Sequence, residues 1–358
     1  MKNPKNLIEL IEGGYVIIAK LPEENNISLE KIKSLDAYTV PLIAHDYGAK
    51  TPIMWNSLYK KLGLNIKNIM LVADPIKNGK IIINTLKLDP KYLGGGFGVG
   101  WKERLNLIDK LEPEELSSIN IVVKKGKNLI GYNTDAEGFI KSLEEKFYEI
   151  RKKIKGSKVI LLGAGGVSKE LAKLIAERGA KRISILNRSY EKAVDLAQEL
   201  NKKYEQIATG DDESMIRGKI LNSYNIPDVI INLTDKGSDG TLVDYSAFHM
   251  ANPNATDLEI DKGNNFSASR TIMRELKKIN PEIIIADIVL PKNPPSKTLA
   301  IAENEGLKNL VDGLGMVIYQ AVPAYLKIQE ANLDKHKKEI SEKQVLKIFK
   351  KATSFKYK

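Results

Sequence analysis

The stretch Val159-Ile-Leu-Leu-Gly163-Ala-Gly165-Gly166-Val-Ser168 decides the fold of this chain of 358 residues. It is typical of a buried parallel strand, a glycine turn and the start of an amphipathic helix, which continues as KELAKLIAERGA. Gly163 permits the tight turn, and Gly165 lets the backbone approach a pyrophosphate. The small Gly166 and Ser168 allow close packing of the helix, whose N-terminus then faces the phosphates. The pattern predicts a dinucleotide site, and the alternative is a glycine-rich turn that binds nothing.

The end of the next predicted strand, RISIL at 182–186, indicates which dinucleotide binds. A site for NAD usually presents Asp or Glu to the ribose hydroxyls at this point, and here the chain has Asn187-Arg188-Ser189. Arg188 can stack on adenine and pair with a 2′-phosphate, and Ser189 can donate to that phosphate, with Lys192 close enough to assist. The sequence therefore predicts NADP, and the alternative is an exposed loop arginine.

The rest of this region follows the same pattern. Two further apolar runs, at 228–232 and 282–290, each follow a helical or polar stretch. We therefore expect an α/β fold in which residues 151–311 form a Rossmann-type NADP domain with a doubly wound parallel sheet. The polar segment 237–280 shows no sustained period and is predicted to be an insertion or a mobile flap.

The first part of the chain predicts a second, mixed α/β domain, because 358 residues exceed the size of a single core. Extended apolar runs at 16–19, 38–44, 68–73, 80–86 and 119–123 alternate with amphipathic segments such as 57–64. A further amphipathic helix is predicted at 104–111. We expect a second domain over residues 1–150, completed by C-terminal helices within 312–358, one of them at 313–331.

Composition excludes several classes of protein. With 42% hydrophobic and 28% charged residues the chain is neither collagen-like nor disordered. No apolar run is long enough for a membrane span, and the N-terminus lacks a secretion signal, so we expect a cytoplasmic protein without a membrane partner. Zero cysteines and three histidines argue against a metal site. The net charge of +11 is dispersed, which favours solvated helix faces over nucleic-acid binding.

Two glycine-bounded segments precede residue 150. One runs from Gly94 to Gly100 and leads into Trp101-Lys102, and the other is Gly131-Tyr-Asn-Thr-Asp135-Ala-Glu-Gly-Phe139. Together with the glycine turn they resemble the shikimate dehydrogenase family, in which such a loop ends in a catalytic lysine and such a box supplies the paired aspartate. The resemblance implies that the domain of residues 1–150 is the substrate-binding and catalytic domain, with a catalytic pair of Lys102 and Asp135. Oxidation of a secondary alcohol needs a group that takes up the hydroxyl proton, which suits this pair, while a surface lysine and a helix cap are the alternatives.

The resemblance continues in collinear order from about residue 36 to residue 330. Residues 41–45, 117–120, 232–234 and 312–321 resemble further motifs of the family. It implies that Asn120 and Gln320 lie at the substrate, and Lys50 and Thr51 are further candidates for this site. The residues that it implies at the cofactor are Gly163, Gly165, Gly166, Val167, Asn187, Arg188, Ser189, Lys192, Thr234 and Gly313.

The departures from the family concern the substrate. Serines that hold the substrate carboxylate in relatives are missing, and Lys50 and Thr51 are the candidates to replace them. Gly96-Phe97-Gly98, with Gly100 after it, stands where relatives have Asn-Val-Thr, and Ile288-Val289-Leu290-Pro291 stands where they have a tyrosine near Asp287. Two explanations stay open. One is sequence drift within the lineage, with the lost contacts to the substrate replaced by Lys50, Asn120, Tyr132 and Gln320. The other is a different substrate acid, bound in a wider, glycine-lined pocket. Trp55 and Trp101 would flank that pocket, and the alternative is that they are core residues.

The sequence predicts an NADP-dependent dehydrogenase that reversibly reduces 3-dehydroshikimate, or a related cyclic keto acid, to shikimate. Quinate, aminoshikimate or another hydroxy acid is an alternative substrate. One alternative function is a nucleotide-binding regulatory protein without turnover, and the acid/base pair argues against it. Another is a methylene-tetrahydrofolate dehydrogenase, and the Asn-Thr-Asp box argues against that. The sequence leaves a homodimer open.

Overall fold

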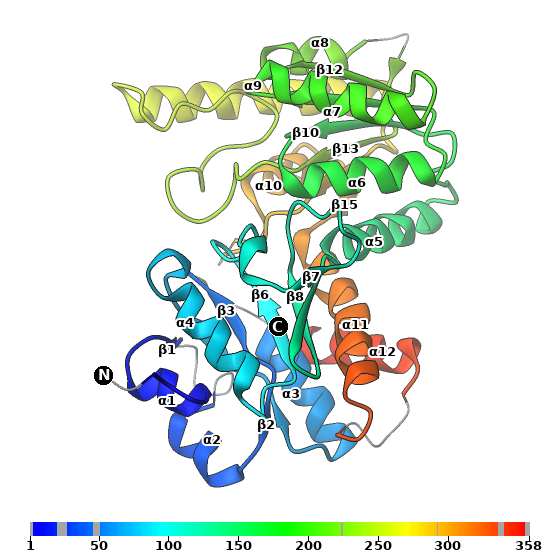
Figure 1. The fold of residues 1–358 in the computed structure, drawn as a ribbon. Coiled ribbons are helices and arrows are strands. Elements are labelled where there is room, and N and C mark those ends of the chain that lie inside the picture. Colours follow the sequence, from blue (N-terminus) through cyan, green and yellow to red (C-terminus); the bar gives the residue numbers. More distant parts are fainter. Residues whose placement is uncertain are drawn as a thin grey trace. The chain divides into compact units, whose positions relative to one another are not determined.

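The computed structural model describes residues 3–19, 27–45, 51–222, 225–291, 293–335 and 340–354 (Figure 1). The chain divides into two compact units. Unit 1 comprises Met1–Asp135 and Ile318–Lys358, and unit 2 comprises Ala136–Val317. The sequence analysis placed the changes at 150 and 312, whereas the structure groups helix α5 (Asp135–Glu149) and the first turn of helix α11 (Gly313–Ala331) with unit 2.

Unit 2 is built on a six-stranded sheet in which every strand pair is parallel. Its order is β12-β11-β10-β13-β14-β15, so the chain reverses its direction of travel between β10 and β13. Ligands of such sheets bind at the carboxyl ends of the strands beside this reversal. The expected Rossmann-type sheet is confirmed, although strands β12 and β15 were not predicted. The strands are β10 (Lys158–Leu162), β11 (Arg182–Asn187), β12 (Ala208–Asp212), β13 (Val229–Asn232), β14 (Ile284–Asp287) and β15 (Asn309–Val311).

Helices cover both faces of this sheet (Figure 1). Alternate strand residues such as Val159 and Leu161 face a core shared with α5, α6 (Gly166–Glu177) and α7 (Tyr190–Lys203). Their neighbours Ile160 and Leu162 face a second core, shared with α8 (Ile216–Ile220), α9 (Leu258–Ile279) and α10 (Lys297–Asn304). The 3₁₀ helix η2 (Glu213–Met215) leads into α8. Burial on both faces explains why these strands read as continuous apolar runs.

The flap predicted at 237–280 is wrong over its second half, because 258–279 form the 22-residue helix α9. Asp257 caps it by accepting a hydrogen bond from the amide of Ile260 at 3.0 Å. Only the second half of α9 buries an apolar stripe, through Ile272, Met273 and Leu276, whereas 258–264 are polar or exposed. The helical period is therefore too short to be recognised in the sequence.

Unit 1 contains a seven-stranded mixed sheet of order β1-β5-β3-β6-β8-β9-β7 and a pair of short strands, β2 and β4. Strand β6 is parallel to β3 and antiparallel to β8, and β8 is antiparallel to β9. This confirms the expected mixed α/β unit. The strands are β1 (Ile17–Ile18), β2 (Tyr38–Thr39), β3 (Leu42–Ala44), β4 (Ile66–Lys67), β5 (Met70–Val72), β6 (Gly94–Phe97), β7 (Lys110–Leu111), β8 (Ile121–Lys125) and β9 (Asn128–Tyr132).

The remaining helices of unit 1 are α1 (Leu7–Glu12), α2 (Leu29–Leu35), α3 (Thr51–Leu62), α4 (Pro75–Leu88), the 3₁₀ helix η1 (Leu105–Leu107) and α12 (Glu342–Ser354). The ring of Trp55 in α3 stacks on Phe349 of α12, with 6.3 Å between the centroids. Tyr325 of α11 meets Trp55 edge-on at 6.0 Å. The C-terminal helices thus complete the core of unit 1. None of the helices in the described part of the chain combines the length and the apolarity that a membrane crossing requires.

Two local predictions in unit 1 are wrong. Residues 80–86 are helical, not extended, because Asp74 caps α4 and Pro75 occupies its first position. Within α4, Ile82, Ile83 and Leu86 are buried on one face. Residues 104–111 do not form a helix: they contain η1 and then β7, which pairs with β9.

Candidate functional site

Lys102 and Asp135 form an ion pair in unit 1. Strands β6 and β9 both pair antiparallel with β8, so they run in the same direction and their carboxyl ends lie at one edge of the sheet. Lys102 follows β6 and Asp135 follows β9. The Nζ of Lys102 donates to the Oδ2 of Asp135 at 2.5 Å, and the side chains are 27% and 7% exposed. The amine therefore remains accessible, while the carboxylate that orients it is shielded from water.

Asn120 holds the second oxygen of Asp135. Asn120 lies just before β8, at the edge of the sheet where β6 and β9 end. Its backbone amide donates to the carbonyl of Tyr132 at 3.0 Å. Its Nδ2 donates to Asp135 Oδ1 at 2.8 Å, and its Oδ1 accepts from the backbone amide of Thr134 at 2.8 Å. The Nδ2 and the Oδ1 of the Asn120 side chain thus both hold the start of α5 in place.

Gln320 and Thr134 complete the network. Gln320 Oε1, from α11, accepts from Asn120 Nδ2 at 3.1 Å and from the Thr134 hydroxyl at 3.2 Å. The structure therefore brings together Lys102, Asp135, Asn120 and Gln320, as the sequence predicted. The sequence analysis missed Thr134, which is buried between them; its place inside the Asn-Thr-Asp box was the only signal.

Asp135 does not act as a side-chain cap of α5. The side chain of Asn133 accepts from the Asp135 amide at 3.0 Å and donates to the carbonyl and the hydroxyl of Ser118. The carboxylate of Asp135 is thereby left to Lys102 and Asn120.

The glycines in β6 and directly after it have a packing role. A Cβ on Gly96, Gly98 or Gly100 would lie 2.7 to 2.9 Å from Leu42, Ala44 or His45, in or directly after β3. A Cβ on Gly95 would lie 2.1 Å from the carbonyl oxygen of Pro41. The close approach of β3 explains these glycines.

The two tryptophans are core residues rather than walls of a pocket. Trp101 is fully buried, packs edge-on against Phe97 and donates from Nε1 to the carbonyl of Ala73 at 2.9 Å. Trp55 is buried among the aromatic rings of α3, α11 and α12.

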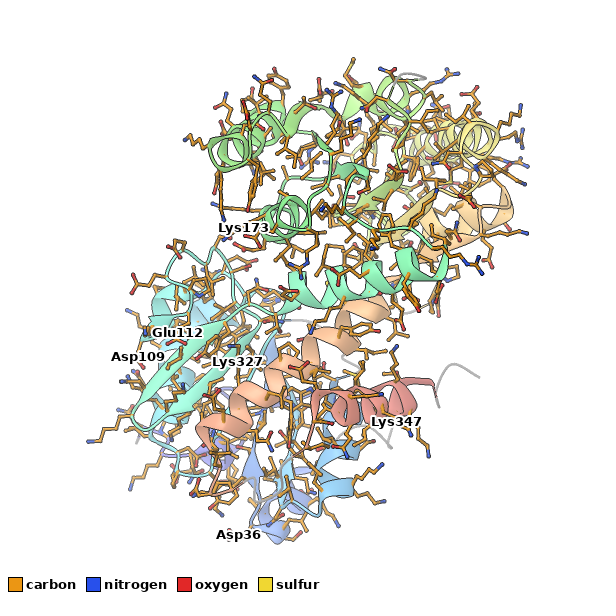
Figure 2. The ribbon with its side chains drawn as sticks, turned by 90° about the vertical axis from the view of Figure 1, so that its right-hand side faces the viewer. Asp36, Asp109, Glu112, Lys173, Lys327 and Lys347 are labelled. Carbon is orange, nitrogen blue, oxygen red and sulfur yellow. The ribbon has the colours of Figure 1, made fainter. Side chains whose placement is uncertain are left out.

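Tyr132, the residue before the box, is held from two sides. Its hydroxyl donates to Glu112 Oε2 at 2.8 Å, and the Nζ of Lys327 lies 4.0 Å from its ring centroid; Figure 2 labels Glu112 and Lys327. Burial and the neighbouring Glu112 carboxylate raise the pKa of Tyr132. Tyr132 therefore stays neutral and supports the backbone on which Asn120 rests. Of the two predicted carboxylate ligands, Thr51 begins α3, and Lys50 lies outside the described residues.

The glycine turn of unit 2 has the form that the sequence predicts. Gly163 has φ +113°, and a Cβ there would lie 3.0 Å from the Leu233 carbonyl oxygen, so no other residue fits well. A Cβ on Gly165 would meet nothing within 4 Å. Gly165 and Gly166 are exposed at the start of α6, and Val167 follows in its first turn. The open backbone and the helix N-terminus suit a pyrophosphate.

Asn187 connects this turn to the loop after β11. Its Oδ1 accepts from the Ala164 amide at 3.1 Å, and its Nδ2 donates to the Ser189 carbonyl at 2.9 Å. Arg188 and Lys192 are exposed, and within the described residues neither forms an ion pair. Both cations are therefore available to a phosphate.

Acidic residues at the end of β12, which the sequence analysis missed, lie next to this loop. Asp212 is the register partner of Asn187. Asp211 pairs with Lys219 at 2.7 Å, Asp212 accepts from the Ser214 amide at 2.8 Å, and Glu213 pairs with Lys236. The lysines offset the charges of Asp211 and Glu213, whereas the Ser214 amide leaves the negative charge of Asp212 in place beside this loop.

Thr234 and Gly313 belong to two further segments at the carboxyl ends of the strands. The amide and hydroxyl of Thr234 donate to Asn232 Oδ1 at 2.9 and 2.7 Å, and Asn232 Nδ2 donates to Asp287 Oδ1 at 2.9 Å. A Cβ on Gly313 would lie 2.3 Å from the Ile288 carbonyl oxygen, so α11 begins in close contact with the segment after β14.

Comparison with known proteins identifies the family. Residues 145–230 match the family model described as shikimate / quinate 5-dehydrogenase. The shikimate dehydrogenase (NADP(+)) of Halothermothrix orenii is 32% identical over 296 residues, covering 80% of this chain and 89% of that protein. The chain belongs to the shikimate dehydrogenase family. It is therefore an NAD(P)-dependent oxidoreductase with a small-molecule substrate.

Solved structures of the shikimate dehydrogenase family share this fold. One is shikimate 5-dehydrogenase from Listeria monocytogenes in complex with shikimate and NAD, with a TM-score of 0.65 and 23% identity, covering 87% of this chain and 96% of that chain. Another is quinate dehydrogenase from Corynebacterium glutamicum in complex with NAD, with a TM-score of 0.62 and 19% identity, covering 88% and 99%.

Asp287 gives this member of the shikimate dehydrogenase family a pH-dependent stability. Burial raises the pKa of Asp287 from 3.8 to about 7. The folded chain therefore holds the proton of Asp287 more tightly than the unfolded chain. This proton contributes to the free energy of unfolding in full below the unfolded pKa, and the contribution is lost as the pH rises through about 7. We expect the free energy of unfolding of the unmodified chain, minus that of D287N, to fall by about 2 kcal/mol between pH 5 and pH 7. Denaturant unfolding of both chains across this range measures the difference, and parallel pH dependences would contradict it.

Proposed function

We propose that the protein is an NADP-dependent dehydrogenase that interconverts 3-dehydroshikimate and shikimate. The observation that carries the proposal is the ion pair of a partly exposed Lys102 with a shielded Asp135. Such a pair presents a proton at a fixed point, which the reduction of a ketone to a secondary alcohol requires. The family, which includes enzymes named for this reaction, supports the proposed substrate.

The proton and the hydride follow separate routes. When bound, the reduced nicotinamide supplies a hydride to the carbonyl carbon of the substrate. The Lys102 ammonium donates its proton to the carbonyl oxygen, and Asp135 stabilises the ammonium before the transfer and orients it. In the oxidative direction, the neutral amine accepts the hydroxyl proton. In this proposal Asn120 and Gln320, which contact Asp135 and Thr134, are also the residues that contact the ring hydroxyls of the substrate.

The residues of unit 2 fit the cofactor. The exposed amides at the start of α6, with Gly165, Gly166 and Val167, would hold the pyrophosphate. Arg188, Ser189 and Lys192 would hold the 2′-phosphate, and Thr234 and Gly313 the nicotinamide half. No acid stands at position 187, which favours NADP over NAD.

The substrate is tested with the purified chain, NADP or NAD, and a panel of shikimate, quinate, aminoshikimate and related hydroxy acids, by the absorbance of the reduced nicotinamide. We expect the highest kcat/KM for shikimate with NADP. A higher value for quinate or another acid would reassign the substrate. Binding of NADPH without turnover of any acid would support the regulatory alternative instead.

Arg188 is expected to set the preference for NADP. Because hydrogen bonds to charged groups contribute about 1.5 to 3 kcal/mol, R188A should lower kcat/KM for NADP roughly 10- to 100-fold and change that for NAD much less. Steady-state kinetics with both cofactors measures the ratio. The matched control is K181A, which removes an exposed cation at the opposite end of β11. An equal loss for NAD and NADP in R188A would contradict the assignment.

A further inference from the structure

The segment between β13 and Ser238, which we call the 232–238 loop, folds around one asparagine. Asn232 is buried, and its Oδ1 accepts from both the amide and the hydroxyl of Thr234. Its Nδ2 donates to the carbonyl of Lys236 at 3.1 Å, and the Lys236 amide donates to the Thr234 hydroxyl at 3.2 Å. The loop is a closed set of hydrogen bonds, so its conformation depends on where Asn232 and Lys236 are anchored.

Asp287 anchors the loop at Asn232. It is fully buried at the end of the neighbouring strand β14 and accepts from Asn232 Nδ2, from the Val289 amide at 2.9 Å and from the Ser296 hydroxyl at 2.6 Å. Its described contacts include no cation. A buried carboxylate that is held only by neutral donors is costly, and an apolar residue would fill the same space at a lower cost. The hydrogen bonds of Asp287, rather than its packing, therefore explain why an aspartate occupies this buried position.

Glu213 anchors the loop at Lys236 from another strand. It follows β12 and pairs with Lys236 Nζ at 2.7 Å, where the side chains are only 9% and 12% exposed for Lys236 and Glu213. The same Nζ donates to the carbonyl of His249 at 2.7 Å, which also ties the loop to the segment before α9. Strands β12 and β14 lie on opposite sides of β13 in the sheet. The loop is thus held from two directions by two shielded carboxylates.

We propose that Asp287 and Glu213 are positioning residues, which hold the 232–238 loop in the conformation that receives the nicotinamide half of the cofactor. The inference rests on the proposed NADP-dependent dehydrogenase function, because it assigns Thr234 to that half. Hydrogen bonds and a shielded ion pair have strict geometry, so they select one loop conformation where apolar contacts would allow several. Asp287 and Glu213 act through Asn232 and Lys236 and do not touch the substrate.

The test uses the full chain with the variants D287A and E213Q. Three quantities are measured: amide hydrogen exchange in peptides spanning 229–240, affinity for NADPH, and kcat with the best acid of the panel. We expect exchange in the loop to rise at least about tenfold, NADPH to bind roughly 5- to 20-fold more weakly, and kcat to fall roughly 10- to 100-fold. KM for the acid should change less than about twofold, since its ligands lie in unit 1.

The matched control is D89A. Asp89 is also a buried carboxylate that accepts from backbone amides, those of Leu7 and Lys91, but it lies in unit 1 away from the proposed ligands. This variant should lose stability without a change in loop exchange or NADPH affinity. If D287A does not fold, D287N and D287S are compared instead. Asparagine keeps an acceptor at the position of Asp287 Oδ1, whereas the shorter side chain of serine does not reach Asn232 Nδ2, so loop exchange should rise only in D287S.

Two results would overturn the proposal. Unchanged loop exchange in D287A and E213Q would show that the carboxylates do not hold the loop, and faster exchange with unchanged NADPH affinity and kcat would show that the loop does not position the cofactor. Failure of the proposed function has a different signature. If the unmodified chain turns over no acid, the substrate assignment fails, whereas loop exchange and NADPH affinity still decide the roles of Asp287 and Glu213.

Discussion

K102A should lower kcat about 10³-fold or more, the largest loss expected for any single substitution in this protein. General acid–base catalysis contributes roughly 10² to 10⁴ in rate, and Lys102 Nζ is the proton donor that Asp135 Oδ2 holds. KM for the acid should change much less, because the proton moves in the transition state. Steady-state kinetics in both directions with saturating NADP or NADPH measures the effect.

Two variants separate proton transfer from charge and from stability. K102R keeps a cation beside Asp135, but a guanidinium does not give up its proton at accessible pH, so it should be nearly as inactive as K102A. K124A removes another partly buried lysine of unit 1, which donates to the carbonyl of Asp89, and should keep most of the activity. A loss below about tenfold in K102A, or roughly 1.4 kcal/mol of barrier, would refute the catalytic assignment of Lys102.

D135N should have the second-largest effect, a fall in kcat of roughly 10²- to 10³-fold. Asparagine has nearly the same shape and still offers an oxygen to Asn120, so the network around Thr134 should persist. The lost charge, however, leaves Lys102 without the shielded carboxylate that orients its ammonium. The same kinetic measurements apply, together with thermal unfolding to show that the fold is intact.

The control for D135N is D109N. Asp109, which Figure 2 labels, is another carboxylate of unit 1. It pairs with Lys87 and accepts from the Leu129 amide at 2.8 Å. D109N should keep kcat within about twofold of the unmodified chain. Equal losses in D135N and D109N would mean that the effect of Asp135 is structural.

The nucleotide-binding half was predictable because its signals are local. Residues 159–177 contain a strand buried on both faces, a turn that requires Gly163 and a helix with one apolar side, all within one βα unit. Each of these features depends on neighbours in the chain, so the pattern of residues is sufficient. The pair of Lys102 and Asp135 was likewise predicted, through motifs that keep their order along the chain.

Other features depend on residues that are distant in sequence, and only the tertiary structure reveals them. Strands β12 and β15 are short and become strands through pairing with β11 and β14. The apolar run at 80–86 is compatible with a strand or a helix, and it forms a helix because Ile82, Ile83 and Leu86 are then buried on one face. Asp287 and Asn232 are 55 residues apart and meet only because β13 and β14 are adjacent. Local pattern determined the cofactor turn, and the collinear order of the family motifs indicated Lys102 and Asp135, which the structure joins in an ion pair. Long-range strand pairing determined the network around that pair and the anchoring of the 232–238 loop, because hydrogen bonds between distant segments leave no periodic trace in a sequence.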